Sequence, residues 1–363
     1  MNYPCLLTTA LLLMIPTIAP AQATIEDLLK ADARARPAHP SSPSDLLDWA
    51  AYNRAGWRAI NKGYYDTAEH EFHAAIKAAR RTSIDDPRLL ARSYADYALA
   101  VQKQGRHAEA EPLAKWALTV RETLLDPESP AIAQNRNQLA TLYYELGRFA
   151  ESEPLLRRSI EAQAKAPKAD PREHARSHTL LGLLLVARRR FAESEPAFLK
   201  AVQILETSRG PSHPETGDGL NNLAWAYHEQ GKDDEARPLF DRALSIFERS
   251  RGPLHPSVAY VLDGLAQIHA ARGENDEAEA KFGRAIAIWE KISGAGASEL
   301  IQILTRYSRS LEAMGRRAER DKVEARIASL PVKVTMSEGK ASPWYRFPEP
   351  TQGAAPMTPR LRG

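Results

Sequence analysis

The sequence predicts an all-α protein built as a solenoid of about seven helical hairpins. A glycine recurs at multiples of 42 residues, at positions 63, 105, 147, 231, 273 and 315, and Arg189 fills the one missing position. The stretches on either side of each glycine carry apolar residues at helical spacing. A fixed period of this length is typical of stacked repeats and not of a domain with one central core.

The first 23 residues predict an export signal. Residues 6–15 form an apolar run, Pro16 ends it, and Ala21-Gln22-Ala23 fits the small-x-small rule for cleavage. The run is too short to span a bilayer as a helix. We therefore expect a periplasmic or secreted protein that begins at Thr24. The alternative is a membrane anchor formed by an uncleaved N-terminal segment.

Residues 24–43 are expected to be a flexible linker, and the repeats are expected to occupy residues 44–330. The only cysteine, Cys5, lies before the cleavage site. Cleavage would leave a chain without disulfide chemistry, whose stability depends on packing alone.

The fifth repeat shows the helical pattern clearly. Its first helix carries Leu220, Leu223, Ala224 and Tyr227 on one face, and Gly231 predicts the helix end. A second helix then carries Ala236, Phe240 and Ala243 at helical spacing. The same small, bulky and small positions recur in the other second helices, so we expect them to form the core between neighbouring repeats. The bulky positions are Phe72, Ala114, Leu156, Phe198, Phe240 and Phe282.

The turns and the two ends carry their own signals. His213 and His255 precede prolines at predicted helix starts, where we expect them to cap the helices. A second set of prolines is expected in the first turns of the second helices: Pro112, Pro154, Pro196 and Pro238. Arg189 is expected to alter the turn of the fourth repeat. In the seventh repeat Arg320 and Glu324 replace the small and bulky residues, which predicts a polar capping helix.

Residues 331–363 differ from the rest of the chain. This tail has six prolines and five basic residues against two acidic ones, so we expect it to be disordered. The preceding 330 residues carry 44 charges of each sign, a balance that argues against a nucleic-acid partner. The aromatic cluster Trp344-Tyr345-Arg346-Phe347 is either a docking motif, for another protein or for the protein's own groove, or a spacer.

The repeated residues resemble those of the tetratricopeptide repeat family. The residues that carry the resemblance are a small residue in the first helix, a tyrosine three residues later and a glycine at the turn. An alanine, a phenylalanine and an alanine then follow in the second helix. The 42-residue spacing, the GPxHP turns and the segment LNNLAWAYHEQGKDDEARPLFDRAL (220–244) are similar to the kinesin-light-chain-like subgroup. The resemblance implies a right-handed superhelix with a concave groove lined by first helices. It also implies a protein-binding scaffold without enzymatic activity.

The resemblance also implies which side chains line the groove. The candidate peptide-binding residues in repeats three to five are Asn137, Gln138, Thr141, Tyr144, Thr179, Leu183, Asn221, Asn222, Trp225 and His228. The equivalent positions include Trp57 in the first repeat, Asp263 and Gln267 in the sixth, and Arg306 in the seventh. Asparagine amides can both donate to and accept from a partner's backbone. Exposed tryptophans would be apolar anchors.

No catalytic motif, phosphate-binding loop or CxxC pair occurs in the sequence. His70 and His73 are three residues apart, a pattern that a helix surface also gives by chance, so no metal and no cofactor is expected. We therefore expect a non-catalytic scaffold that binds a peptide or extended protein segment in its groove. The alternative is a structural assembly factor of an envelope or secretion complex that uses its end repeats or convex face.

Overall fold

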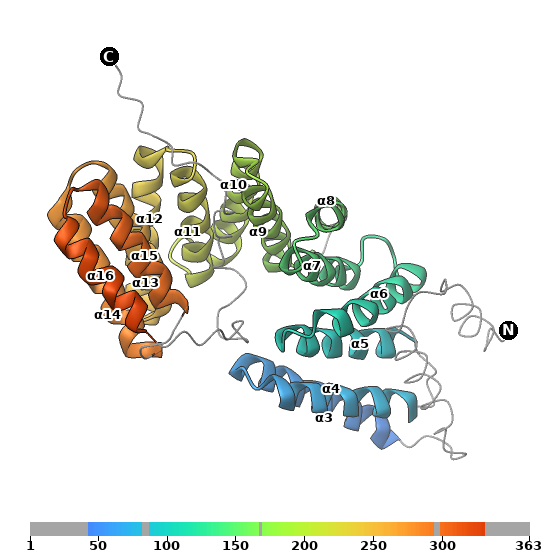
Figure 1. Ribbon diagram of the computed structural model, residues 1–363. Coiled ribbons are helices and arrows are strands. Elements are labelled where there is room, and N and C mark those ends of the chain that lie inside the picture. The colour runs from blue at the N-terminus through green and yellow to red at the C-terminus, as the bar shows by residue number, and fades with distance from the viewer. Residues whose placement is uncertain (1–42, 82–86, 167–168, 294–297, 331–363) are drawn as a thin grey trace. The chain divides into compact units, whose positions relative to one another are not determined.

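The computed structural model describes residues 43–81, 87–166, 169–293 and 298–330. The export signal, most of the linker and the tail predicted from the sequence lie outside these residues. The described residues contain fourteen helices and no strand, which confirms an all-α repeat solenoid. Figure 1 shows consecutive helices lying side by side as hairpins, such as α3 beside α4 and α15 beside α16.

The first helices of the seven repeats are α3 (Pro43–Lys62), α5 (Pro87–Lys103), α7 (Pro130–Glu145), α9 (Pro171–Ala187), α11 (Pro214–His228), α13 (Pro256–Ala271) and α15 (Ser298–Ala313). The second helices are α4 (Tyr65–Arg81), α6 (His107–Leu124), α8 (Phe149–Lys165), α10 (Phe191–Arg209), α12 (Asp233–Arg251), α14 (Asn275–Ser293) and α16 (Arg317–Ser329). The chain divides within α9 into an N-terminal unit that ends at Leu180 and a C-terminal unit that begins at Leu181.

The predicted core positions are buried as expected. Phe72, Phe198, Phe240 and Phe282 are fully buried, and Ala114 and Leu156 nearly so. Small residues in the first helices make room for these rings. A Cβ placed on Gly264 of α13 would lie 2.5 Å from the Phe240 ring, so this glycine is required by close packing.

The turns between paired helices share one geometry. Gly147 has φ +71°, and its N–H donates to the Tyr144 carbonyl over 3.0 Å. Arg189 has φ +57°, and its N–H donates to the Val186 carbonyl over 2.8 Å. The expectation that Arg189 alters the turn is therefore wrong, because its backbone takes the left-handed conformation that glycine takes elsewhere.

One of the two predictions about prolines is confirmed and the other is wrong. Pro214 and Pro256 begin helices, and the imidazoles before them act as caps. Nδ1 of His213 accepts from the Glu215 N–H and Nδ1 of His255 from the Ser257 N–H, each over 3.1 Å. The placement of the second set in first helical turns is wrong: Pro112, Pro154, Pro196 and Pro238 lie inside α6, α8, α10 and α12. These helices begin two residues after the turn position, so each proline falls in the second turn.

The second helices are joined across neighbouring repeats by a recurring polar clamp. In the N-terminal unit Arg148 lies 2.6 Å from Oε2 of Glu111, and the Tyr143 hydroxyl lies 3.3 Å from Oε1 of the same side chain. The clamp repeats in the C-terminal unit, where Lys232 and Tyr227 both contact Glu195. Glu111 and Glu195 thus each connect one repeat to the next.

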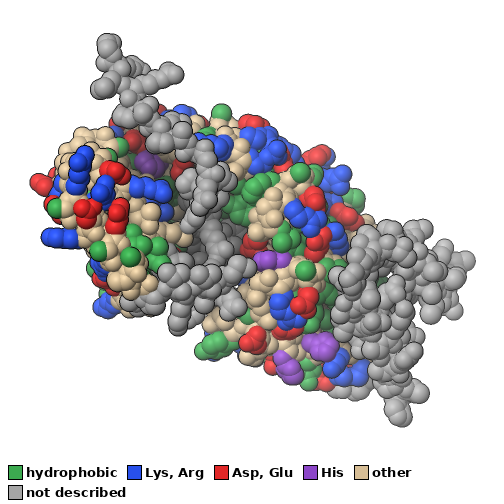
Figure 2. All heavy atoms as spheres, in the orientation of Figure 1, with side chains coloured by type: hydrophobic (Ala, Val, Ile, Leu, Met, Phe, Trp, Pro, Cys, Tyr) green, Lys and Arg blue, Asp and Glu red, His purple; other side chains and the backbone are tan. Residues whose placement is uncertain are grey.

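The last helix, α16, has the polar character expected of a cap. None of its residues is buried. Figure 2 shows basic and acidic side chains next to one another over the region of α14 and α16, and Arg326 of α16 pairs with Glu290 of α14. The last described helix therefore presents a polar surface where earlier second helices carry buried residues.

Candidate functional site

Polar side chains connect the first helices of successive repeats. In the N-terminal unit, Asn53 of α3 donates through Nδ2 to Oδ2 of Asp96 on α5 over 3.0 Å. Gln138 of α7 donates through Nε2 to the Ala95 carbonyl of α5 over 2.7 Å. Each repeat begins its set of groove residues with two adjacent residues, such as Asn137 and Gln138 in the third repeat, which we call the first and second groove positions. Both contacts join the first groove position of one repeat to the second groove position of the next. We call each such contact a rung.

The first rung contains a buried acid. Burial raises the pKa of Asp96 above its ordinary value, although the Asn53 amide and the nearby Arg92 and Arg121 guanidinium groups oppose the shift. The Asn53 amide and the two guanidinium charges therefore compensate a carboxyl group that is largely shielded from water. This pattern favours a structural role for Asp96 in joining two repeats.

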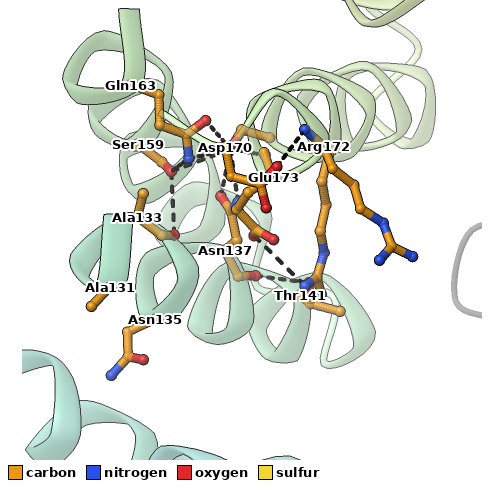
Figure 3. Close-up of polar contacts among 12 residues, drawn as sticks. Ala131, Ala133, Asn135, Asn137, Thr141, Ser159, Gln163, Asp170, Arg172 and Glu173 are labelled. Atoms are coloured by element: carbon orange, nitrogen blue, oxygen red, sulfur yellow. Dashed lines mark hydrogen bonds and ion pairs between the residues drawn. The ribbon is translucent and has the colours of Figure 1, made fainter. Parts of the chain in front are cut away.

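Asn137 lies in a closed polar network at the junction of α7, α8 and α9 (Figure 3). Its Nδ2 donates to Oε1 of Glu173 and to Oγ of Ser177, each over 2.7 Å. Ser177 in turn contacts Ser159 and Gln163 of α8. Asn137 is fully buried, and its amide group is occupied within the protein.

The C-terminal unit carries a charged rung at the same repeat positions of its first helices. Oδ2 of Asp263 on α13 lies 2.7 Å from the guanidinium of Arg306 on α15, and Gln267 donates to Oδ1 over 3.1 Å. The Asp263 side chain is 2% exposed and that of Arg306 31%. Burial raises the pKa of Asp263, and the Arg306 charge and the Gln267 hydrogen bond oppose this. The guanidinium group of Arg306 is therefore partly exposed, whereas the Asp263 carboxylate that pairs with it is buried.

His228 lies at the end of α11 in the same unit. Its Nδ1 is 2.7 Å from Oδ1 of Asp233, at the start of α12. Burial alone would lower the pKa of His228, but the hydrogen bond and the charge of Asp233 outweigh burial, so the pKa is raised.

One rung of the C-terminal unit is missing. Asn221 of α11 occupies the first groove position, and the second position of the next repeat is Gly264, which has no side chain to offer. The Oδ1 atom of Asn221 is buried and has no hydrogen-bond partner among the described residues, and the same holds for Oδ1 of Asn222. Gly264 cannot carry a partner for Asn221, because the Phe240 ring fills the space of its Cβ. Close packing between repeats thus leaves the amide oxygen of Asn221 unpaired.

The tetratricopeptide repeat profile matches residues 98–165, 173–249 and 229–291, which is more than half of the chain. The chain belongs to the tetratricopeptide repeat family. No curated protein sequence matches it.

Solved structures support the same fold. A variant of a putative kinesin light chain from Podosopora anserina, with nearly identical TPR-like repeats, is 25% identical over 57% of this chain and 98% of its own, with a TM-score of 0.50. Aspartyl phosphate phosphatase F from Bacillus subtilis is 16% identical over 79% and 84%, with a TM-score of 0.55. The apo form of RapI is 12% identical over 77% and 96%, with a TM-score of 0.59. The last two likenesses concern the fold alone.

The structure places the ten predicted groove residues of this tetratricopeptide array in two classes. Buried side chains are Asn137, Thr141, Thr179, Leu183, Asn221, Asn222 and Trp225, and half-buried ones are Gln138, Tyr144 and His228. It brings Asn137 and Thr141 together in the N-terminal unit, and Asn221, Asn222, Trp225 and His228 along α11. Their role in binding stays a prediction. Sequence reasoning missed Glu173 and Ser177 as partners of Asn137, because no fixed spacing announces them.

The two predicted tryptophan anchors differ in exposure. Trp225 is 7% exposed, and its ring packs edge-on against Phe240 with centroids 5.4 Å apart. Trp57 of α3 is 36% exposed, with one edge against Phe72. Trp225 is therefore part of the packed core, whereas Trp57 presents apolar surface to solvent.

The described ranges hold neither a metal-binding cluster nor a membrane-spanning helix. Within them no three His, Cys, Asp or Glu side chains are grouped so as to hold a metal ion. None of the helices there combines the length and apolarity that crossing a membrane requires.

Proposed function

We propose that this tetratricopeptide repeat protein is a non-catalytic scaffold that binds an extended segment of another protein along α11, α13 and α15. The family is one of protein–protein interaction scaffolds, which fixes the general class. The observation that carries the finer proposal is the unpaired amide oxygen of Asn221, one rung short of a partner. We further propose that the protein is exported, on the strength of its N-terminal sequence.

An unpaired buried acceptor is costly to the folded protein. Leaving such a group unsatisfied costs about 1–3 kcal/mol, because it has lost water without gaining a donor. A peptide backbone N–H that reaches Oδ1 of Asn221 or Asn222 recovers this cost. A partner in extended conformation offers such N–H groups at regular intervals, and the amides accept them whatever the partner's side chains are.

The same unit also offers hydrogen-bond donors to the backbone carbonyls of such a partner. The side chains of His228 and Arg306 are 18% and 31% exposed, and Arg309 of α15 is exposed. Imidazole and guanidinium N–H groups donate to backbone carbonyls. The first helices of the C-terminal unit thus hold buried, unpaired acceptors on α11 and exposed donors on α15, so a peptide backbone would have to displace neighbouring side chains to reach the acceptors.

The test is capture of partners from the native host's envelope fraction by the immobilised protein and an Asn221→Leu variant. Leucine has a similar volume and no acceptor, so the fold should persist, which circular dichroism checks. An exposed asparagine replaced in the same way, Asn61→Leu, is the control. Trp225→Ala is unsuitable because it removes a buried ring.

A protein captured by the wild type and by Asn61→Leu, and lost by Asn221→Leu, supports the proposal. Equal capture by all three overturns it and favours the alternative, an assembly factor that binds through its end repeats or outer face. Binding of a synthetic peptide from the captured partner, measured by calorimetry, then decides whether an extended segment is sufficient.

A further inference from the structure

The first helix, α3, leaves open the face that the next first helix buries. In α5, Leu89 packs against the alanines at the end of α4. Oγ of Ser93 accepts from the Trp49 indole of α3 over 2.8 Å, and the Tyr94 hydroxyl lies 2.6 Å from the Arg80 guanidinium of α4. The α5 residues in contact with α3 or α4 are Leu89, Leu90, Ser93, Tyr94, Asp96, Tyr97, Ala100 and Gln104. This face of a first helix therefore joins it to the preceding repeat.

The matching residues of α3 lie 42 positions earlier, since Gly63 and Gly105 mark equivalent turns. They are Leu47, Asp48, Ala51, Tyr52, Arg54, Ala55, Arg58 and Lys62, and we call them the α3 face. No described helix precedes α3, and all of these residues are exposed except Ala55, which is half-buried. Leu47 is 71% exposed, more than any other large hydrophobic side chain in the described ranges. The α3 face is thus a repeat-joining surface that no described helix covers.

The charges of the α3 face are ordered along the helix. Asp48 lies near the start of α3, and the cations Arg54, Arg58 and Lys62 lie toward its end. The Asp48 side chain is 51% exposed and lies only within 4.0 Å of Arg81, which pairs more closely with Asp45. A second α3 in the parallel direction would oppose like charges. In the antiparallel direction it sets the acid of each copy near the cations of the other and opposes the helix dipoles favourably.

The middle of the α3 face allows two helices to approach closely. Ala51 and Ala55 are one turn apart and lie between Asp48 and Arg58, so no long side chain holds the backbones apart there. Leu47 lies beside this alanine pair and loses its contact with water when a second helix covers it. Exposed ion pairs contribute little to affinity, so the apolar residues supply the binding energy and the charges set the direction.

The other end of the array is a poor match for the α3 face. Seven of the thirteen residues of α16 are charged, and none is buried. A head-to-tail contact of α3 with α16 of another copy would place Leu47 against charged side chains. Contact of α3 with α3 instead joins identical surfaces, closes after two copies and leaves no open end for further addition.

We propose that the α3 face is a homodimer interface, in which α3 of a second copy packs antiparallel against it. Ala51 and Ala55 of the two copies meet at the centre, and Asp48 of each copy lies near Arg58 and Lys62 of the other. The second copy takes the place that a preceding repeat has in the rest of the array. The dimer joins two binding arrays through their first repeats, and it does not depend on whether α11 binds a peptide.

The first test is sedimentation of the full chain over a range of concentrations, in a Cys5→Ser background that prevents disulfide dimers. Leu47→Asp and Ala51→Arg should each raise the dissociation constant of the dimer by about tenfold or more, because a charge or a long side chain enters the contact. Leu199→Asp is the control, since Leu199 of α10 is also exposed, and it should leave the constant unchanged. Circular dichroism checks that all variants are folded. A wild type that is monomeric at every concentration overturns the proposal, as does a dimer that both variants retain.

The second test addresses the direction of the two helices. Arg58→Asp sets an acid near Asp48 of the other copy and should weaken the dimer several-fold. Adding Asp48→Arg to the same chain exchanges the two charges, so the double variant should regain the affinity of the wild type. A double variant that stays as weak as Arg58→Asp overturns the antiparallel arrangement.

Discussion

At the scale of the residue, the turn position of the fourth repeat shows how strictly the backbone is specified. Arg189 is the one non-glycine residue with positive φ among the described residues. An L-residue in this conformation costs about 1–2 kcal/mol relative to the right-handed region, because Cβ approaches the following carbonyl. The Arg189 guanidinium lies 5.6 Å from the Phe191 ring centre, a contact that offsets part of this cost.

Arg189→Gly should therefore stabilise the protein. Glycine removes the steric cost in the folded state, but it also increases the conformational freedom of the unfolded chain, which offsets part of that effect. We therefore expect the free energy of unfolding to rise by about 0.5–1 kcal/mol. Urea denaturation followed by circular dichroism measures the difference. Gly147→Arg, which creates the reverse situation at an equivalent turn, should destabilise by a similar amount. A loss of stability in Arg189→Gly would show that the aromatic contact outweighs the backbone strain.

At the scale of the element, the clamp between second helices links neighbouring repeats. Burial alone would raise the pKa of Glu111, but hydrogen bonds and charge from Arg148 and Lys115 outweigh it, so the pKa lies below its ordinary value. A carboxyl group with a depressed pKa in the folded state stabilises the protein at pH values above its unfolded pKa. That contribution is lost as the pH falls through the folded pKa.

Glu111→Gln should accordingly destabilise the protein at pH 7 by about 0.5–1 kcal/mol, since the clamp is only partly buried. The difference from wild type should shrink as the pH falls through the depressed pKa of Glu111, where the wild-type carboxylate becomes protonated. Urea denaturation at several pH values measures this trend. Glu151→Gln, which removes only an exposed partner of Arg148, should have a smaller effect. A difference that does not change with pH would mean that packing, and not charge, accounts for the loss.

At the scale of the whole molecule, stability depends on contacts between neighbours along the array. Phe240 is fully buried and touches both its own repeat, through Trp225, and the next one, through Gly264. Ile327 lies in the terminal helix α16, where nothing is buried. The cost of losing an apolar side chain should therefore differ strongly between the middle of the C-terminal unit and its end.

Phe240→Ala should cost about 3–5 kcal/mol, and Ile327→Ala less than about 1.5 kcal/mol. Hydrogen exchange resolved by helix adds the spatial test. Phe240→Ala should raise exchange in α11, α12 and α13 together, whereas Ile327→Ala should affect α15 and α16. Equal losses at the two sites would contradict a nearest-neighbour array.

Much of the fold follows from the sequence because the same pattern of glycine, small and bulky residues recurs in several repeats. The glycine period, the buried phenylalanines and the capping histidines are all predicted at the correct residues. The interior prolines are predicted one turn too early, since sequence alone does not show that the second helices begin two residues after the turn. The exposure of the groove residues is not predictable either. Asn137 and Asn221 occupy the same repeat position, yet Ser177 and Glu173 bind the Asn137 amide while Gly264 leaves Oδ1 of Asn221 without a partner.

The sequence by itself determined the class of protein: a periodic chain of amphipathic hairpins can bury its apolar faces only by stacking, and that yields a tetratricopeptide solenoid. Only the tertiary structure decided which polar groups are satisfied and which apolar faces are covered. Hydrogen bonding depends on which side chains from helices some forty residues apart meet, and a single glycine imposed by the Phe240 ring changes that outcome. The unpaired amide oxygens of α11 and the exposed leucines of α3 are therefore properties of the folded array, although every residue that creates them is visible in the sequence.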